Sequence, residues 1–491
     1  VSASLGTMIV PDWFWLSNGN KADLGVGQSY SNKKINSLYG TVGVNYDGWA
    51  FLDITARNDW SSALSKENQS FFYPSVSASW VISDMINNRG KGMPEWFTYA
   101  KARVSYAEVG NDMDPYQLYN AYSIGSEGNT GGITASPSSS TLYSDKVKSE
   151  LIKSWEAGAE VRFFNNRLGL DFTWYKSNAT RQLLNLPMNS LSGYGAVKIN
   201  AGNIQNSGIE IALNTTPIET EDWTWDLNFT YTRNRSKIIE LHENVADFIA
   251  LSGDVAYGNY RVGSVAKVGG AYGLLMSDSM TKVDKTSGMK VLGWSANMIS
   301  AHWYRSGELE EVGDINPDFL GSLNTSLRYK NWNLSVSLDA RFGGMVASYG
   351  GRYGTSYGFT KSSLAYRDAA HGGTTFTSRW DGITYDDGVI PEGILLKGTA
   401  LPQPDGSTYT VGTGAYSSGE TYAELIASGH IEPTHAPYWT YRNNQWVNAS
   451  LDRGVVNDSW FTELNYIALR DVNLTYTFPS NIAGKIGAKN L

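Results

Sequence analysis

AEVRFFNNRLGLDFTWY, residues 159–175, alternates apolar and polar side chains on both sides of an Asn165–Asn166 pair. Successive side chains of a β-strand point to opposite faces, so each arm of this segment has one apolar and one polar face. Asparagine tolerates the positive φ angles of a tight turn, and the segment therefore predicts a β-hairpin. A soluble β-sandwich and a membrane-spanning β-barrel would both produce this pattern, so the rest of the chain must separate them.

The composition of the 491-residue chain narrows the class of protein. Its formal net charge of −8 and its lack of a basic block argue against nucleic-acid binding. The absence of Cys excludes a disulfide scaffold, a thiol nucleophile and a thiolate metal site in this chain. No window approaches the roughly 20 consecutive apolar residues of a membrane-spanning helix. A mean hydropathy of −0.31 is compatible with a membrane barrel, because only every second residue of a barrel strand meets lipid.

Further hairpins repeat the pattern of the first one. Alternating arms flank Asp47–Gly48, 217–222 and Lys330–Asn331, and one more alternating strand is predicted at 470–478. A strand pair at 74–82 and 97–107 also fits the same up-and-down order. In a membrane barrel, one face of these strands would meet lipid. The residues predicted to face lipid are Leu170, Phe172, Leu227, Phe229, Leu334 and Val336.

Short turns alternate along the chain with long connections that are rich in Gly, Ser and Tyr. Transmembrane barrels have short turns on the periplasmic side and long loops outside, whereas long structureless loops are uncommon in compact soluble domains. Aromatic residues also gather beside the short turns, as they do in the girdle of a membrane barrel. This asymmetry favours the barrel over the sandwich. The predicted long connections are 108–153, 177–206, 235–319 and 343–459.

Several segments together resemble the SusC/RagA-type TonB-linked outer-membrane transporters. They occur in the order found in that family and cover nearly the whole chain. They are RNDWSSALSKENQSFFYPSVSASWVISD (57–84), KARVSYAEVGND (101–112), INAGNIQNSGIEIALN (199–214), GDINPDFLGSLNTSLRYKNWNLSVSLDARFGG (313–344) and FTELNYIALRDVNLTYTFP (461–479).

The resemblance implies an all-β fold, a transmembrane antiparallel β-barrel in a bacterial outer membrane. The whole family barrel has 22 strands and encloses a plug domain, whereas about a dozen strands can be counted here. Neither a plug nor a TonB box is recognisable, and VSASLG at the start lacks the features of a signal peptide. We therefore expect residues 1–491 to form the middle and late part of such a barrel.

The resemblance also implies what the protein does and with which partners. Family members import a nutrient oligomer, a glycan or a peptide, with energy supplied through TonB and with a SusD-like surface lipoprotein over the extracellular loops. Two alternatives remain open: a secreted or surface β-rich glycan-binding protein without transport activity, and a passive porin. The longest connection is 343–459. We expect it to be extracellular and to be ordered partly by its own packing and partly by contact with the lipoprotein.

No set of residues predicts an enzyme, a cofactor or a metal centre. HIEPTH (430–435) is not a helical zinc motif, so a solvated pair of histidines is the better interpretation. GVGQSY (25–30) lacks the third glycine of a phosphate-binding loop. YDDG (385–388) lacks EF-hand spacing and is predicted to be a turn, with a calcium site in this loop left open.

Two groups of residues remain as candidates for function. Charged residues on the polar face of the strands are expected to line the barrel interior and contact the plug: Arg57, Arg103, Arg162, Asp339 and Arg341, with Glu160, Asp171 and Asp226 beside them. Aromatic residues in the long connections are candidates for stacking on sugar rings or peptide side chains, although they could equally pack the connections together or face a partner. These are Trp294, Trp303, Tyr304, Tyr349, Tyr353, Trp380, Trp439 and Trp446.

Overall fold

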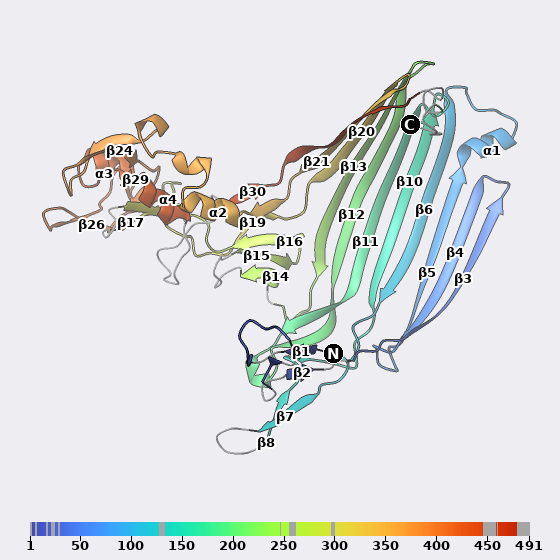
Figure 1. Cartoon of the computed structure of the whole chain (residues 1–491), viewed down its shortest axis with the longest axis horizontal. Helices are drawn as coiled ribbons and strands as arrows, with labels where there is room; N and C mark the ends of the chain where they lie inside the picture. The colour runs from blue at the N-terminus through green and yellow to red at the C-terminus, as the bar shows by residue number, and fades with distance from the viewer. Residues whose placement is uncertain are drawn as a thin grey trace.

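The computed structural model describes residues 2–4, 7–15, 18–20, 25–27, 30–126, 133–245, 247–254, 262–295, 300–444, 458 and 460–478. A tall, curved β-sheet dominates these residues, and a smaller lobe lies to one side of it (Figure 1). Of the 12 strands in the sheet, the short β9 (Thr141–Leu142) pairs in parallel with β12 and lies off the main path. The strands of the main path, in spatial order, are β3 (Ile35–Tyr46), β4 (Ala50–Ser61), β5 (Ser70–Val81), β6 (Phe97–Asn111), β10 (Glu150–Phe163), β11 (Leu168–Pro187), β12 (Ala196–Glu219), β13 (Trp223–Glu240), β20 (Phe319–Tyr329), β21 (Trp332–Phe342) and β31 (Tyr466–Tyr476).

Each strand on this path is antiparallel to the next, and the predicted tight turns are confirmed. Asn165 and Asn166 have φ angles of 55° and 68° between β10 and β11. Asp47 has a φ of 50° between β3 and β4, and Lys330 has a φ of 48° between β20 and β21. These left-handed conformations suit the twist of a hairpin. Between β5 and β6 the somewhat longer connection contains α1 (Ile82–Asn88).

Strand register divides the side chains of the sheet between an apolar face and a polar face. One row of paired residues on the apolar face is Leu170, Leu213, Phe229, Leu323 and Leu338. The adjacent row, on the polar face, is Asp171, Ala212, Thr230, Ser322 and Asp339. Leu170 and Phe229 are 37% and 40% exposed, so within the described residues the apolar face is not packed against a second sheet. All six residues predicted to face lipid lie on this apolar face.

The prediction of a long connection at 177–206 is wrong for most of these residues. Here β11 and β12 continue as a paired hairpin from Ser177–Asn206 to Pro187–Ala196, which leaves only 188–195 between them. The segment does not alternate, because Leu183 and Leu184 are adjacent, and Arg181 and Gly202 interrupt the extended backbone with φ angles of 55° and 82°. Strand pairing uses backbone groups alone, so the ladder continues without an alternating pattern of side chains. The structure places the other long connections at 112–149, 241–318 and 343–465.

The lobe is built from the connections at 241–318 and 343–465. The first contributes a four-stranded sheet of β14 (Phe248–Asp254), β15 (Val262–Lys267), β16 (Tyr272–Ser277) and β19 (Glu310–Asp314), and the hairpin of β17 (Leu292–Ser295) and β18 (Ser300–Trp303). The second contributes α2 (Tyr349–Ser356), α3 (Tyr422–Ala427), α4 (Ala436–Asn444) and the pairs β25 (Ile394–Leu396) with β28 (Gly419–Thr421) and β26 (Ala400–Pro402) with β27 (Thr408–Thr410). It also contributes the sheet of β23 (Thr374–Thr377), β24 (Thr384–Val389) and β29 (Thr434–His435), and the strand β22 (Met345–Ala347) paired with β30 (Phe461–Glu463).

Smaller elements complete the described chain. They are the strand pairs β1 (Ser2–Ser4) with β2 (Gly25–Gly27) and β7 (Tyr122–Ser126) with β8 (Ile133–Pro137), and the 3₁₀ turns at Ser190–Ser192, Lys361–Leu364 and Ala369–His371. No helix in the described part of the chain is long and apolar enough to cross a membrane.

The two faces of β13 give a direct test of the membrane assignment. Phe229 lies on the apolar face near the middle of the strand, and Asn228 lies beside it on the polar face, where it donates to Asn214. We expect Phe229→Arg to lower the free energy of unfolding by about 2–4 kcal/mol, because the guanidinium would enter the hydrocarbon, and Asn228→Arg to lower it much less. Urea titration of the full-length protein in phosphatidylcholine vesicles measures both. Equal losses would show that the faces are wrongly assigned.

Candidate functional site

The polar face of the sheet carries an ion pair that spans three strands. Arg103 on β6 donates to both carboxylate oxygens of Asp171 on β11 at 2.7 and 3.1 Å, and it also donates to the hydroxyl of Thr173. Strand β10 lies between these two strands, and its residue at this level is Gly158. A Cβ atom on Gly158 would lie 2.7 Å from the Arg103 guanidinium. The missing side chain is therefore what lets Arg103 reach across β10.

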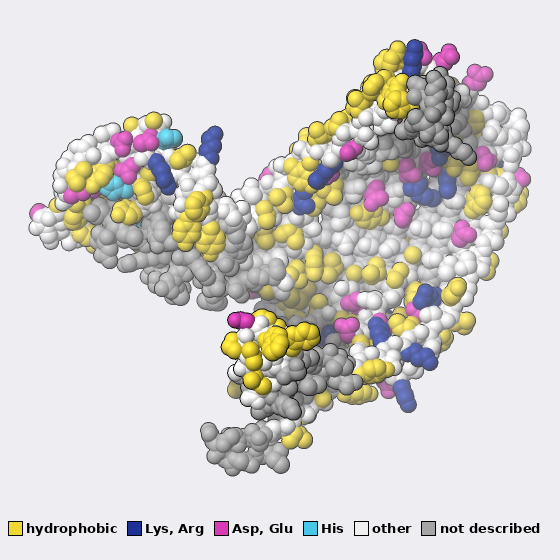
Figure 2. Space-filling view, viewed as in Figure 1, with side chains coloured by type: hydrophobic (Ala, Val, Ile, Leu, Met, Phe, Trp, Pro, Cys, Tyr) yellow, Lys and Arg dark blue, Asp and Glu magenta, His cyan; other side chains and the backbone are white. Residues whose placement is uncertain are grey.

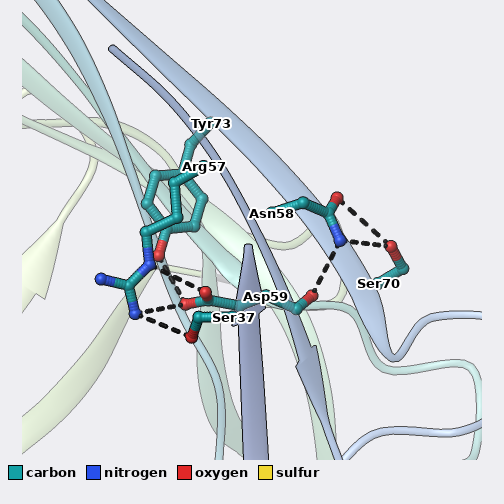
Figure 3. Close-up of polar contacts among 6 residues, drawn as sticks. All are labelled: Ser37, Arg57, Asn58, Asp59, Ser70 and Tyr73. Carbon is teal, nitrogen blue, oxygen red and sulfur yellow. Dashed lines mark hydrogen bonds and ion pairs between the residues drawn. The ribbon is translucent and has the colours of Figure 1, made fainter. Parts of the chain in front are cut away.

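A second polar cluster joins β3, β4 and β5 (Figure 3). The Arg57 guanidinium donates to the Asp59 carboxylate at 2.8 and 3.2 Å and to the Ser37 hydroxyl at 3.1 Å. Tyr73 donates its hydroxyl to the same carboxylate at 2.5 Å. Asp59 is only 5% exposed, and a buried carboxylate of this kind is stable only when its oxygens are paired, as they are here.

The remaining charged candidates also have neighbours. Arg162 donates to Glu160 at 2.6 Å and lies over the Tyr99 ring at 5.0 Å. Asp339 on β21 accepts two hydrogen bonds from Arg470 on β31, at 2.5 and 2.9 Å.

Arg341 donates to the carbonyl of Ile315 at 3.0 Å and so fixes the connection that precedes β20. Figure 2 shows dark blue and magenta side chains next to one another on the hollowed side of the sheet.

All five residues predicted to line the interior therefore share the polar face. Arg57 and Arg162 each pair with a carboxylate on their own strand. Arg103 and Asp339 each pair with a charge on another strand, and Arg341 donates to backbone carbonyls. Such self-neutralised pairs suit a wetted wall, because each charge keeps a partner and stays partly solvated. Their contact with a plug domain stays a prediction. Tyr73 and Thr173 were not singled out from the sequence, although their strand positions place them on this face. Arg470 reaches the polar face only through the register shift of β31 against β21 between Ser337 and Leu338.

The aromatic candidates fall into different environments in the lobe. Trp294, Trp303 and Trp439 pack against one hydrophobic core, and the rings of Trp303 and Trp439 meet edge to face at 5.2 Å. The buried residues of this core are Leu292, Ala301, Leu395, Leu401, Val411, Tyr422, Leu425 and Ile431. Residues from both connections thus build a single core, and three of the predicted ligand contacts are part of its packing.

The other aromatic candidates lie nearer the surface of the lobe. Tyr304 packs beside His302 at 5.5 Å, Tyr353 stacks with Tyr357 at 6.5 Å, and Trp380 is partly exposed at the end of a turn. Contact between these residues and a ligand stays a prediction. Trp446 lies outside the described residues, as does the side chain of Tyr349.

The two histidines of HIEPTH have separate partners. His435 lies 2.9 Å from Asp387, while His430 stacks on the Tyr409 ring at 3.5 Å. The turn predicted at YDDG is wrong, because these residues belong to β24, and pairing of β24 with β29 brings Asp387 to His435. In the described residues, no three His, Cys, Asp or Glu side chains converge as a metal site.

Polar contacts also tie the two connections of the lobe together. The hydroxyls of Ser287 and Ser418 each donate to Asp284 at 2.7 Å, and these hydrogen bonds lower the pKa of Asp284 to about 2. Deeper in the lobe, burial raises the pKa of Tyr422, whose hydroxyl is 2.8 Å from the carbonyl of Glu432. At neutral pH Asp284 is therefore charged and links the two connections through Ser418, whereas Tyr422 is neutral and links two parts of the second connection.

The bridge over Gly158 can be tested with a matched pair of substitutions. We expect Gly158→Ala to displace Arg103 from Asp171 and to lower the free energy of unfolding by about 1.5–3 kcal/mol, the range for a hydrogen bond to a charged group. Gly169→Ala on β11 is the control, because its Cβ would meet its nearest neighbours at an ordinary 3.8 Å. Urea titration in vesicles compares the two. Equal stability of the two variants would contradict the bridge.

Comparisons with known proteins agree with this fold. The chain matches the family model "TonB dependent receptor-like, beta-barrel" over residues 12–358. TonB-dependent receptor P3 of Formosa agariphila is 28% identical over 341 residues, which cover 65% of this chain and 33% of that protein. TonB-dependent receptor SusC of Bacteroides thetaiotaomicron is 25% identical over 329 residues, which cover 63% of this chain and 31% of that protein. The chain therefore spans about a third of the length of these relatives.

Solved structures extend the likeness to the lobe. The RagAB peptide importer in its closed-closed state matches with a TM-score of 0.63 at 15% identity, covering 98% of this chain and 45% of that one. At this identity the match shows the fold alone. Since the family model covers more than half of the chain, the chain belongs to the TonB-dependent receptor-like β-barrel family of outer-membrane proteins, and it is SusC-like.

Proposed function

We propose that this chain is part of the wall of an outer-membrane importer that takes up a nutrient oligomer, a glycan or a peptide. In this proposal TonB supplies the energy, and a SusD-like surface lipoprotein covers the long connections. The observation that carries the proposal is the division of the sheet into an open apolar face and a charged polar face. A barrel wall needs lipid contact on one side and a wetted interior on the other.

The polar face suits the wetted interior of a barrel wall. Its arginines are held in ion pairs within the sheet, as in Arg103–Asp171 and Arg57–Asp59, so the wall is hydrophilic without strong net charge. A transporter of polar oligomers benefits from such a wall, because it does not trap the substrate by charge.

The lobe supports recognition of a substrate or a partner at one end of the barrel. Its shared core gives the connections a rigid scaffold, on which partly exposed residues such as Trp380 and Tyr304 can act as contacts. RagAB is a peptide importer, whereas SusC is named only as a TonB-dependent receptor, and likeness of fold to RagAB does not assign a substrate. Glycan and peptide therefore both stay candidates for this chain.

The alternative of a soluble glycan-binding sandwich has less support. A sandwich would cover the apolar face of the sheet with a second sheet, yet Leu170, Phe172 and Phe229 are exposed among the described residues.

Import can be tested in the bacterium that encodes the full-length protein. Deletion of the gene should abolish growth on the one oligomer class that the protein imports, and leave growth on the corresponding monomers unchanged. A complementing copy should restore growth only when TonB is intact. Uptake of a fluorescent oligomer measures the same step directly. Restoration of growth in a strain without TonB would contradict energised import and revive the passive porin.

Orientation of the lobe can be tested by limited proteolysis of intact cells. We expect cleavage within 343–459 from outside, because long connections of a barrel lie on the extracellular side, and slower cleavage when the surface lipoprotein is present. The short turn at Asn165–Asn166 serves as the internal control and should be cleaved only after the cells are opened. Cleavage of 343–459 from the periplasmic side alone would reverse the orientation.

A further inference from the structure

The apolar face carries the same pattern on three strands, on the side of the sheet from which the long connections leave. On each strand an aromatic residue is followed, two positions closer to that side, by a basic residue. The pairs are Trp155 and Lys153 on β10, Trp174 and Lys176 on β11, and Tyr231 and Arg233 on β13. A spacing of two keeps both members of a pair on one face of the strand.

Two more cations extend this row on β13, at Arg235 and Lys237. We call Lys153, Lys176, Arg233, Arg235 and Lys237 the basic belt. The register of β10, β11, β12 and β13 places all five on the apolar face. Lys176 and Arg235 there lie opposite Ser207 of β12, one on each side of it. All five side chains are exposed.

The basic belt is only partly neutralised. Glu108 reaches Lys153 at 3.4 Å, and Asp318 reaches Arg235 at 2.6 Å. Within the described residues, Lys176, Arg233 and Lys237 have no ion-pair partner. Five cations against two carboxylates make this a positive surface on a chain whose formal net charge is −8.

The position of the belt relative to lipid follows from the aromatic residues beside it. Trp and Tyr side chains at the edge of an apolar band lie at the level of the lipid headgroups. Residues two positions apart along a strand are separated by about 7 Å, so the cations lie at or just beyond that level. The polar face, with Arg57 and Arg103, is on the other side of the sheet. The belt therefore faces the surroundings of the barrel and not its interior.

We propose that the basic belt binds phosphate-bearing headgroups of anionic lipids in the leaflet on the side of the long connections. Lys and Arg donate strong hydrogen bonds to phosphate oxygens, and each basic residue near a membrane surface adds to the attraction for anionic lipid. The aromatic side chains next to the belt, on the side of the apolar band, lie at the headgroup level and so keep the cations close to the lipid phosphates. The proposal rests on the membrane assignment, and it uses the proposed orientation only to identify this leaflet as the outer one.

Lipid selectivity of the full-length protein tests this proposal without measuring transport. The protein is reconstituted in phosphatidylcholine vesicles that contain trace spin-labelled phosphatidic acid or spin-labelled phosphatidylcholine, and electron paramagnetic resonance reports the protein-bound fraction of each. We expect phosphatidic acid to be preferred by about threefold or more. The variant K176Q/R233Q/K237Q should lower that preference to about one.

Three controls make the outcome decisive. The charge-preserving variant K176R/R233K/K237R should keep the preference, as should K66Q/K91Q/K361Q, which removes three exposed lysines outside the belt. Millimolar inorganic phosphate should displace phosphatidic acid no more than chloride of equal ionic strength does. The proposal is overturned by an unchanged preference in the glutamine variant, by an equal loss in the K66Q/K91Q/K361Q control, or by specific displacement with free phosphate, which would indicate a site for the ion alone. None of these lipid-binding results depends on whether the protein imports a substrate, so the two proposals are tested separately.

Discussion

Backbone hydrogen bonding in the absence of water is the constraint on which this structure depends. Inside a bilayer every N–H and C=O group of a spanning segment needs a partner within the protein, and an antiparallel ladder of strands supplies it. From β3 to β31 each strand on the main path pairs with its neighbours on both sides, except at the two ends. The outer edges of β3 and β31 have no partner among the described residues. In a membrane such edges require further strands, and the curated relatives are about three times as long as the matched stretch.

Once the strands are paired, side chains alternate along each strand, so one half of them faces lipid and the other half faces water. Residues such as Leu170 and Phe229 form the lipid side, and residues such as Asp171 and Thr230 form the wetted side. The wetted side then acquires cross-strand contacts of its own, of which the Arg103–Asp171 bridge reaches across a whole strand at Gly158. In the described residues, the connections at 241–318 and 343–465 do not pair with the strands of the main sheet, and they fold around a separate core. One constraint thus leads to a wall, a polar lining and an independent lobe.

The sequence predicted those strands of the sheet that have lipid on one face and water on the other. Hairpins at Asp47, Asn165 and Lys330 alternate because lipid and water select different side chains, and all three are present. The extension of β11 and β12 was missed because its apolar residues, such as the adjacent Leu183 and Leu184, do not alternate with polar ones, although backbone pairing continues there.

Among the candidate functional residues, alternation placed Arg57, Arg103, Arg162, Asp339 and Arg341 on the correct face, because that face depends only on strand position. Arg470 was not among the candidates, because its direction depends on a register shift that no local sequence signal indicates. The packing of Trp294, Trp303 and Trp439 depends on contacts between two distant connections, which alternation cannot reveal.

The central claim is that β13 has one side in lipid and the other in water. This chain contains no Cys, so single cysteines can be introduced for nitroxide labelling one position at a time. In the full-length protein in vesicles, collision rates with oxygen and with a water-soluble nickel complex report the two environments. We expect high oxygen and low nickel accessibility at Leu227 and Phe229, and the reverse at Asp226, Asn228 and Thr230. Equal accessibility at neighbouring positions, or high nickel accessibility throughout, would show that β13 does not separate lipid from water.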